Sequence, residues 1–194
     1  MSEGTRFALF LSAALLLALT PGPGILYALG RTLNGGRREG VLSCLGTFVG
    51  GSVHVLGAAL GLSAVWATSA TAFQVVRYAG AIYLVYLGIT MIRNRDLKQE
   101  FETETRRSHQ HVLQGITTEV LNPKTALFFL SSIPQFVSVS RGHVTLQFLL
   151  LGTISVALNT LVDLAVVVFA GTLARQLKTT PDSIGASEPH PAPE

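Results

Sequence analysis

Residues 7–29 read FALFLSAALLLALTPGPGILYAL and contain no charged side chain. A helix needs about 20 mostly apolar residues to cross the roughly 30 Å of hydrocarbon in a bilayer, so this stretch predicts a membrane-spanning helix. It is too long for the apolar core of a signal peptide, which favours a helix that is retained. We therefore expect this part of the chain to lie in a lipid bilayer.

The composition of the whole chain agrees with a membrane protein. Of its 194 residues 48% are hydrophobic and 13% charged, whereas a soluble domain has about 25% charged residues. The apolar content also excludes a disordered chain. The 14 basic residues lie between apolar blocks, so they indicate membrane topology and not nucleic-acid binding. The single cysteine, Cys44, cannot form an internal disulfide.

Four further apolar stretches are long enough to span a bilayer. With the first, they give predicted spans at residues 7–29, 41–64, 73–92, 112–139 and 144–171. The sequence thus predicts an all-α, polytopic helical membrane protein whose single transmembrane domain covers residues 1–178. Residues 179–194 are rich in Pro, Ser and Glu and are predicted to form a disordered polar tail.

Basic residues predict the orientation, because they are retained on the cytoplasmic side of short loops. They gather after spans one, three and five, and the longest basic loop covers residues 93–111. The other side has only Arg6, Arg77 and Arg141. We therefore expect the N-terminus outside, and the basic loops and the tail inside.

Two apolar stretches are interrupted by prolines, and each precedes a similar segment. Pro21 and Pro23 interrupt the first span, and Pro123 interrupts the fourth; the segments 46–49 and 152–155 follow them, about 106 residues apart. A repeat with an odd number of spans is inserted upside down the second time, and inverted repeats with broken helices are typical of secondary transporters. This indicates a 3+3 inverted repeat in which helices one and four are broken.

The same residues resemble the LysE/RhtB family of amino-acid exporters of the bacterial inner membrane. The Pro21-Gly22-Pro23 element resembles the hallmark of the first helix of that family. Glu119, residues 121–126 (LNPKTA), Phe128-Phe129 and residues 134–136 (PQF) resemble its fourth-helix signature. The resemblance covers residues 7–178. It implies a multi-pass secondary transporter that exports an amino acid or a close derivative, and proton exchange is the expected coupling.

The family pattern has six helices, but no sixth apolar run follows residue 178. The expected inverted repeat is therefore incomplete. The alternative interpretation is a truncated or partner-dependent membrane protein of the same fold that does not transport.

The broken helices are the predicted substrate site. Pro21 and Pro23 each remove a backbone donor, and Gly22 permits unusual dihedral angles, so carbonyl groups are freed there. Freed carbonyls in a membrane must be buried in protein or face a wet cavity, where they can bind a substrate. A packing kink is the structural alternative.

Lys124 is the residue for which the sequence most specifically predicts a role in substrate binding. A charge in the middle of a membrane costs about 2.5 to 3.5 kcal/mol on insertion scales, so it requires a partner or a function. Together with Asn122 and Pro123, it is expected to receive the substrate carboxylate. The alternatives are that Lys124 snorkels to an interface or pairs with Glu119.

Asn159 and Asp163 are four residues apart and share one face of span five. Asp163 is expected to bind the substrate ammonium or to carry a coupling proton; a structural hydrogen bond is the alternative. Glu119 and His54 are further candidates for proton coupling. We expect Glu119 near the cytoplasmic edge of its span, and a buried structural role is favoured for His54.

Other classes of function find little support. No nucleophile elbow, phosphate loop or dinucleotide motif is present, which argues against an enzyme, ATP-driven transport or a bound cofactor. No metal site is expected, because His109 and His111 lie in a charged linker. Gly46 with Gly50, and the pair 57 and 61, predict close helix packing within the chain in preference to a homodimer, which stays an alternative.

Overall fold

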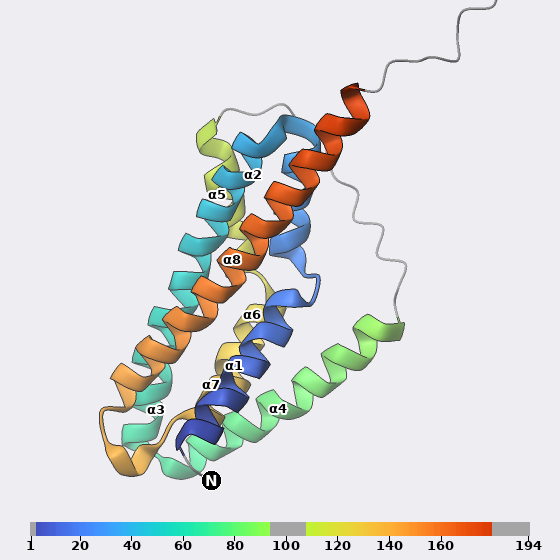
Figure 1. The fold of residues 1–194 in the computed structure, drawn as a ribbon. Helices are drawn as coiled ribbons and strands as arrows, with labels where there is room; N and C mark the ends of the chain where they lie inside the picture. Colours follow the sequence, from blue (N-terminus) through green and yellow to red (C-terminus); the bar gives the residue numbers. More distant parts are fainter. Residues whose placement is uncertain (1–2, 94–107, 180–194) are drawn as a thin grey trace, which may run out of the picture.

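The computed structural model describes residues 3–93 and 108–179, and within these ranges every regular element is a helix. Figure 1 shows an elongated bundle in which the long helix α8 (Val144–Thr179) runs along one side. Most of the predicted basic loop and nearly all of the predicted tail lie outside the described residues.

We call the helices that correspond to one predicted span a helical path. The first path, which consists of α1 (Glu3–Leu19) and the part of α2 (Pro23–Gly57) before Gly36, is broken at its prolines. Helix α1 ends before Pro21, and α2 begins at the second proline. Proline suits the first position of a helix because the missing N–H has no intrahelical partner there. Gly22 between the two helices is extended, with φ −143° and ψ 177°.

Helix α2 contains a reversal of the chain, which Figure 1 shows at the top of the bundle. The turn lies at Gly36, whose φ of +81° falls in the left-handed region that glycine adopts readily. The first path therefore continues beyond residue 29, and the next one begins before residue 41. Arg31, which the predicted spans place in a loop, lies in helix α2.

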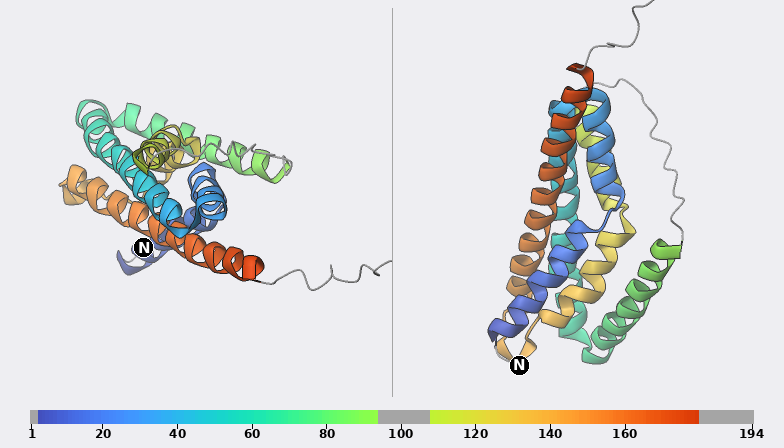
Figure 2. Two further views of the ribbon diagram at one scale, coloured as in Figure 1. Left: turned by 90° about the horizontal axis from the view of Figure 1, so that it is seen from above. Right: turned by 45° about the vertical axis from the view of Figure 1, so that its right-hand side comes forward.

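The descending helix continues from α2 through the π-helix η1 (Ala58–Leu62) and α3 (Ser63–Thr68). Ser69 has extended backbone, and α4 (Ala70–Arg93) then follows in a new direction. In Figures 1 and 2, α4 runs obliquely beside the bundle.

The fourth path is broken as well. Helix α5 (Ser108–Val120) is followed by a break at residues 121–122 and by α6 (Pro123–Leu127), the π-helix η2 (Phe128–Ser132) and α7 (Ile133–Phe136). Asn122 is extended, as expected of a residue before proline. A loop containing the 3-10 helix η3 (Val139–Arg141) leads to α8.

The end of the predicted basic loop needs a correction. Helix α5 begins at Ser108, so residues 108–111 of that loop are helical. His111 is only 2% exposed, and its Nε2 lies 3.6 Å from Oε2 of Glu39 on α2. The histidine therefore belongs to the contact between α2 and α5 and not to a solvated linker.

The larger apolar core joins both broken paths to α8. Its side chains come from α1, the end of α2, η1, α4, η2, α7, the residue after α7 and α8. Phe10, Ile133 and Phe148 are fully buried in it. Burial of large apolar side chains from several helices holds these helices in register.

Helices α2 and α5 approach closely because both have glycines at the contact. The Cα of Gly46 lies about 3 Å from where a Cβ on Gly115 would stand. The predicted close packing within the chain is confirmed for Gly46 and Gly50. It is wrong for Gly57 and Gly61, since a Cβ on either would meet nothing within 4 Å among the described residues.

Two helical stretches in the described part of the chain contain a segment long and apolar enough to cross a membrane: Pro23–Val65, which includes the reversal at Gly36, and Val144–Gln176. Large apolar side chains are exposed on the outer surface, for example Leu16, Leu60 and Phe169. An exposed apolar surface of this kind suits hydrocarbon better than water. The all-helical prediction is confirmed for the described residues; five spans and an inverted repeat stay predictions.

Candidate functional site

Buried polar side chains lie close together in the bundle interior, near the break between α5 and α6. They come from α2, α5, α6, the break itself and α8. These side chains share near-complete burial: Thr47, Glu119, Asn122, Lys124, Thr125, Ser155 and Asp163. A buried polar group is costly unless it has hydrogen-bond partners, so each of them requires an explanation.

Lys124 crosses from the fourth path to the break in the first. Its Nζ donates to the backbone carbonyls of Leu17 at 3.0 Å and Thr20 at 2.9 Å. These carbonyls belong to the last turn of α1 and the break after it, where the helix dipole attracts a cation. The Leu17 carbonyl also accepts a hydrogen bond from the backbone N–H of Thr20 at 3.2 Å. Lys124 is 7% exposed and therefore does not snorkel to water. Of the predicted alternatives, snorkelling is wrong.

Glu119 lies at the second break, at the end of α5. Its Oε1 accepts a hydrogen bond from the Thr125 hydroxyl at 2.6 Å, and its Oε2 accepts one from the Asn122 amide at 3.0 Å. Asn122 in turn accepts from the backbone N–H of Lys124 at 3.0 Å and caps α6. A carboxylate is favourable at the N-terminus of a helix because of the helix dipole.

The prediction for the position of Glu119 is wrong. The sequence predicts it near the edge of its span, but its side chain is 1% exposed and lies between the two halves of the broken path. The physical reason is the break itself, which ends α5 inside the bundle.

Asp163 has one carboxylate oxygen without a donor. The Thr47 hydroxyl donates to its Oδ2 at 3.3 Å, but its Oδ1 is buried without a hydrogen-bond partner among the described residues. The residue is 1% exposed and lies within electrostatic range of Lys124 and Glu119. An acceptor in this position can take a hydrogen bond from an ammonium, from water or from a protonated group.

A small cavity lies beside these groups. Its volume is about 10 Å³, and Leu17, Glu119, Thr125 and Asn159 are among its lining residues. This is about the space that one water molecule requires, so the cavity in this conformation does not accommodate an amino acid. Asn159 thus faces the same space as Glu119, whereas Asp163 is connected to it through Thr47.

Two glycines at the first break make room for the charged side chains. A Cβ on Gly22 would lie 3.0 Å from Cε of Lys124, and a Cβ on Gly24 would lie 2.7 Å from Oε2 of Glu119. Both glycines are buried. The Pro-Gly-Pro-Gly sequence therefore both breaks the helix and lets the opposite path approach its ends.

His54 is half-buried and stands behind Glu119. Its Nε2 lies 2.9 Å from the backbone carbonyl of Glu119, and its ring stacks on Phe129 with 5.9 Å between the centroids. Since that carbonyl lies at the end of α5, the contact fits the structural role that the sequence favoured. Pro21 and Pro123 are both exposed, so they shape the site through the backbone.

The sequence did not single out Thr47 and Thr125, whose hydroxyls hold the two carboxylates. Both lie in segments of interest, Thr47 in the repeated Gly-Thr motif and Thr125 in the LNPKTA signature. A hydroxyl inside an apolar span is a weak signal, because it can also bond to its own helix backbone.

Comparison with known proteins gives the family context of this site. The family model described as "LysE type translocator" matches residues 15–186. A leucine efflux protein of Enterobacter is 30% identical over 177 residues, which cover 90% of this chain and 83% of that protein. A leucine efflux protein of Salmonella choleraesuis is 31% identical over 146 residues, which cover 74% and 69%.

A third relative, from Vibrio cholerae, has the name "uncharacterized membrane protein". It is 30% identical over 171 residues, which cover 88% of this chain and 83% of the relative. No solved structure matches the chain significantly.

Proposed function

This chain belongs to the LysE type translocator family, and from that premise we propose that it exports an amino acid across the bacterial inner membrane. It is a membrane transport protein and not an enzyme. The two relatives named leucine efflux protein favour an amino acid with an apolar side chain as the substrate.

The buried oxygen of Asp163 is the observation that carries the proposal. A carboxylate oxygen without a partner in an apolar bundle is costly, and a substrate ammonium would remove that cost. Asn159, one helical turn before it, lines the adjacent cavity and would add an amide. These two residues would hold the ammonium end of the amino acid.

Lys124 would hold the carboxylate end. An ammonium group has three N–H donors, and two of those in Lys124 donate to Leu17 and Thr20. The third can donate to a substrate carboxylate, while Asn122 and Pro123 keep the helix terminus in place. Residues 21–23 would contribute the backbone of the first break.

The small volume of the central cavity supports transport by alternating access. In the conformation described here the site is too small for an amino acid, so the two broken paths would have to separate to admit one. Broken helices facing each other at a site in the middle of a bundle are typical of secondary transporters built from inverted repeats. Spans one to three and four onward would form the two units.

Asp163 is also our candidate for the coupling proton, with Glu119 as second candidate. Both carboxylates are buried beside Lys124, so gain or loss of a proton would change the charge balance of the site. His54 bonds to a backbone carbonyl and is the weakest of the three.

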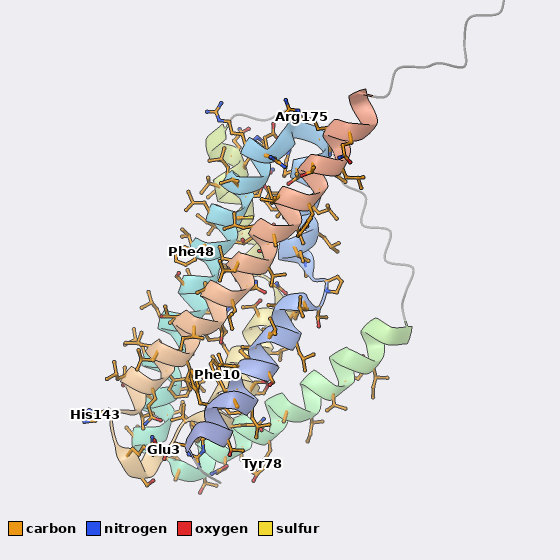
Figure 3. The ribbon with its side chains drawn as sticks, viewed as in Figure 1. Glu3, Phe10, Phe48, Tyr78, His143 and Arg175 are labelled. Atoms are coloured by element: carbon orange, nitrogen blue, oxygen red, sulfur yellow. The ribbon has the colours of Figure 1, made fainter. Side chains whose placement is uncertain are left out.

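The distribution of arginines supports the proposed orientation. Arg37 and Arg175 lie together at one end of the bundle, where Arg37 donates to the Thr172 hydroxyl at 2.5 Å. Arg6 and Arg141 lie together at the other end. Figure 3 shows the two ends, marked by Arg175 and by Glu3 with His143. The end with Arg37 and Arg175 would face the cytoplasm.

Efflux of radiolabelled leucine from preloaded cells that express this chain tests the proposal. We expect export by the wild type and its loss in Asp163→Asn at matched membrane abundance. The matched control is Asp163→Glu, which keeps the carboxylate and should retain part of the export.

Export that is unchanged in Asp163→Asn would show that the proposed site is wrong. Correct insertion without export of leucine or other apolar amino acids would favour the non-transporting alternative. Measuring export against external pH then tests the proton: the wild type should depend on pH, and any activity left in Asp163→Asn should not.

A further inference from the structure

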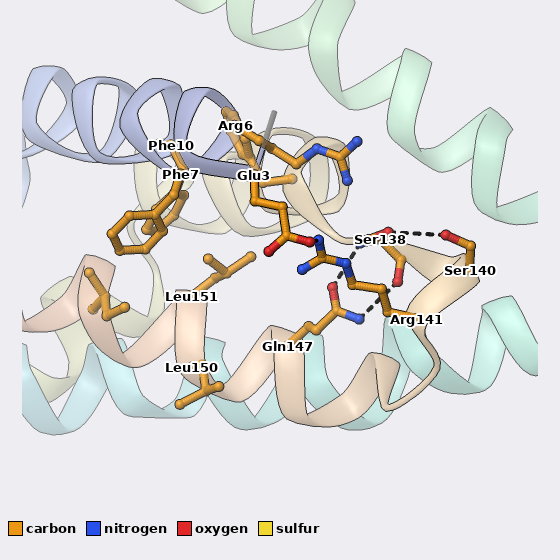
Figure 4. Close-up of a pocket in the computed structure, with 12 residues that line it drawn as sticks. Glu3, Arg6, Phe7, Phe10, Ser138, Ser140, Arg141, Gln147, Leu150 and Leu151 are labelled. Atoms are coloured by element: carbon orange, nitrogen blue, oxygen red, sulfur yellow. Dashed lines mark hydrogen bonds and ion pairs between the residues drawn. The ribbon is translucent and has the colours of Figure 1, made fainter. Parts of the chain in front are cut away.

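A second and larger cavity lies at the end of the bundle where the chain begins. Its volume is about 570 Å³, which is within the usual range of small-molecule sites. It is formed by the start of α1, the loop between α7 and α8, and the first turns of α8 (Figure 4). This outer pocket is separate from the central site and takes no part in the binding proposed there.

The lining of the outer pocket has two chemically different ends. Phe7 and Phe10 lie at one end, and Glu3 and Arg141 form an ion pair towards the other, as Figure 4 shows. Arg6 adds a second cation. A ligand that fills the pocket would therefore need an apolar part and a part with both charges.

The walls of the pocket are held in place by internal contacts. Gln147 donates from Nε2 to the carbonyls of Ser138 at 2.9 Å and Gly142 at 2.8 Å, and its Oε1 accepts from the backbone N–H of Ser138 at 2.7 Å. The ring of Phe10 packs edge-on against Phe136, with 5.5 Å between the centroids. A preformed pocket reduces the cost of ordering the protein when a ligand binds.

The outer pocket and the central cavity are neighbours along the same two helices. On α1, Phe10 lines the pocket and Leu17 lines the cavity, which is about 10 Å further along the helix. On α8, Ile154 lines the pocket and Ser155 lines the cavity. Phe10, which lines the pocket, and Val156, which lines the cavity, belong to the same apolar core.

We propose that the outer pocket binds a zwitterionic amino acid with an apolar side chain. In this proposal the pocket is a second substrate-binding site, which the exported amino acid occupies after it leaves the central site. The substrate carboxylate would bind Arg141, the ammonium would bind Glu3, and the side chain would lie against Phe7 and Leu151, with Phe10 packed behind them. The substrate thus replaces the ion pair between Glu3 and Arg141 with two equivalent pairs. This inference rests on the proposed function for its choice of ligand.

The pairing of charges distinguishes this ligand from an anionic lipid. An anionic headgroup would satisfy Arg6 and Arg141 but would place its negative charge beside Glu3. An amino acid matches both signs at once. An anionic lipid in the pocket is therefore the competing outcome of the test.

Cysteine protection in the purified full chain tests the proposal. Cys44, which is buried, is replaced by alanine, and Ser140→Cys then places a thiol in the pocket lining. The rate of labelling by a fluorescent maleimide is measured in nanodiscs while L-leucine is titrated. Thr145→Cys is the matched control, because Thr145 is exposed at the same end but does not line the pocket.

We expect leucine to slow labelling of Ser140→Cys about tenfold and to leave Thr145→Cys unchanged. Glu3→Gln and Arg141→Gln should each raise the leucine concentration required about tenfold, which corresponds to about 1.4 kcal/mol. Arg38→Gln, next to the chain reversal at the opposite end of the bundle, should have no effect. 4-Methylpentanoate and isoamylamine, which each lack one charge, should protect about tenfold more weakly than leucine.

Two central-site variants, Lys124→Ala and Asp163→Asn, separate this proposal from the proposed function. Protection that persists in either variant supports an independent outer site. Protection that disappears in both, while the labelling rate of Thr145→Cys stays at the wild-type value, would show that it is transmitted from the central site and would overturn the inference.

Comparing the cysteine-protection result with the export assay distinguishes the remaining outcomes. Export by the wild type without protection would overturn the outer site alone, whereas protection without export would overturn the proposed function alone. Protection by phosphatidylglycerol, or by phosphatidylethanolamine, whose headgroup carries both charges, in place of leucine would assign the pocket to a lipid and overturn the inference.

Discussion

The ammonium of Lys124 donates a 2.9 Å hydrogen bond to the backbone carbonyl of Thr20, and this contact joins the two broken helical paths. The two residues are 104 positions apart in the sequence. A cation at the end of α1 and the carboxylate of Glu119 at the start of α6 place each charge where the helix dipole favours it. Each break is thus stabilised by side chains of the fourth path.

Replacement of Lys124 should weaken both the fold and export. In Lys124→Met the carbonyls of Leu17 and Thr20 lose a charged donor, and hydrogen bonds to charged groups contribute about 1.5 to 3 kcal/mol. We expect a lower melting temperature in detergent and no leucine export at matched abundance. Arg38→Met removes an exposed cation and should change neither; an equal effect of both substitutions would contradict the special position of Lys124.

A double-mutant cycle should show that Glu119 and Lys124 are coupled. Glu119→Gln removes one of the two buried carboxylates that interact with Lys124 and leaves Asp163, whereas Lys124→Met leaves Glu119 and Asp163 buried without that cation. The double variant removes both charges and should be more stable than the sum of the single effects predicts, by about 1 kcal/mol. Thermal unfolding of the four proteins measures this, and strict additivity would show that the charges act independently.

Export should depend on the hydroxyl group of Thr47 more than on the size of the Thr47 side chain. Thr47→Val keeps the shape of the side chain but removes the donor to Oδ2 of Asp163. We expect export to fall about tenfold, because the carboxylate is then held less well. Thr47→Ser retains the hydroxyl and should export at nearly the wild-type rate, so loss of export in both would assign the effect to packing.

A glycine-to-alanine substitution should destabilise the protein at the close contact of α2 and α5 but not at a position of α2 outside this contact. A Cβ on Gly46 would lie 2.3 Å from the backbone carbonyl oxygen of Val112, so Gly46→Ala must push the helices apart. Overpacking of this kind costs about 1 to 3 kcal/mol. Gly57→Ala is the control and should not destabilise the protein, because its Cβ would meet nothing within 4 Å among the residues that the structure describes. Thermal unfolding in detergent compares the two variants, and an equal loss in both would assign the effect to the backbone.

Several features of the fold follow from local chemistry and are therefore readable from the sequence. The apolar composition predicts helices in a membrane, and the prolines at 21, 23 and 123 place the helix breaks, because proline lacks the backbone donor. Asn159 and Asp163 share a face through helical periodicity alone. The reversal at Gly36 lies inside the loop predicted at residues 30–40, but the helix that continues on both sides of it was not predicted, since a glycine next to another glycine and two arginines is also typical of an ordinary loop.

Hydropathy and backbone geometry within a few residues are enough to specify the helices, their breaks and the presence of charges inside them. The packing of the helices selects which groups meet. It brings Lys124 to the carbonyls of α1, places Glu119 in the interior and pairs Thr47 with Asp163. The contacts of Lys124 and Asp163 join residues from different helical paths, and their distances depend on how the helices pack, which no local pattern of residues encodes.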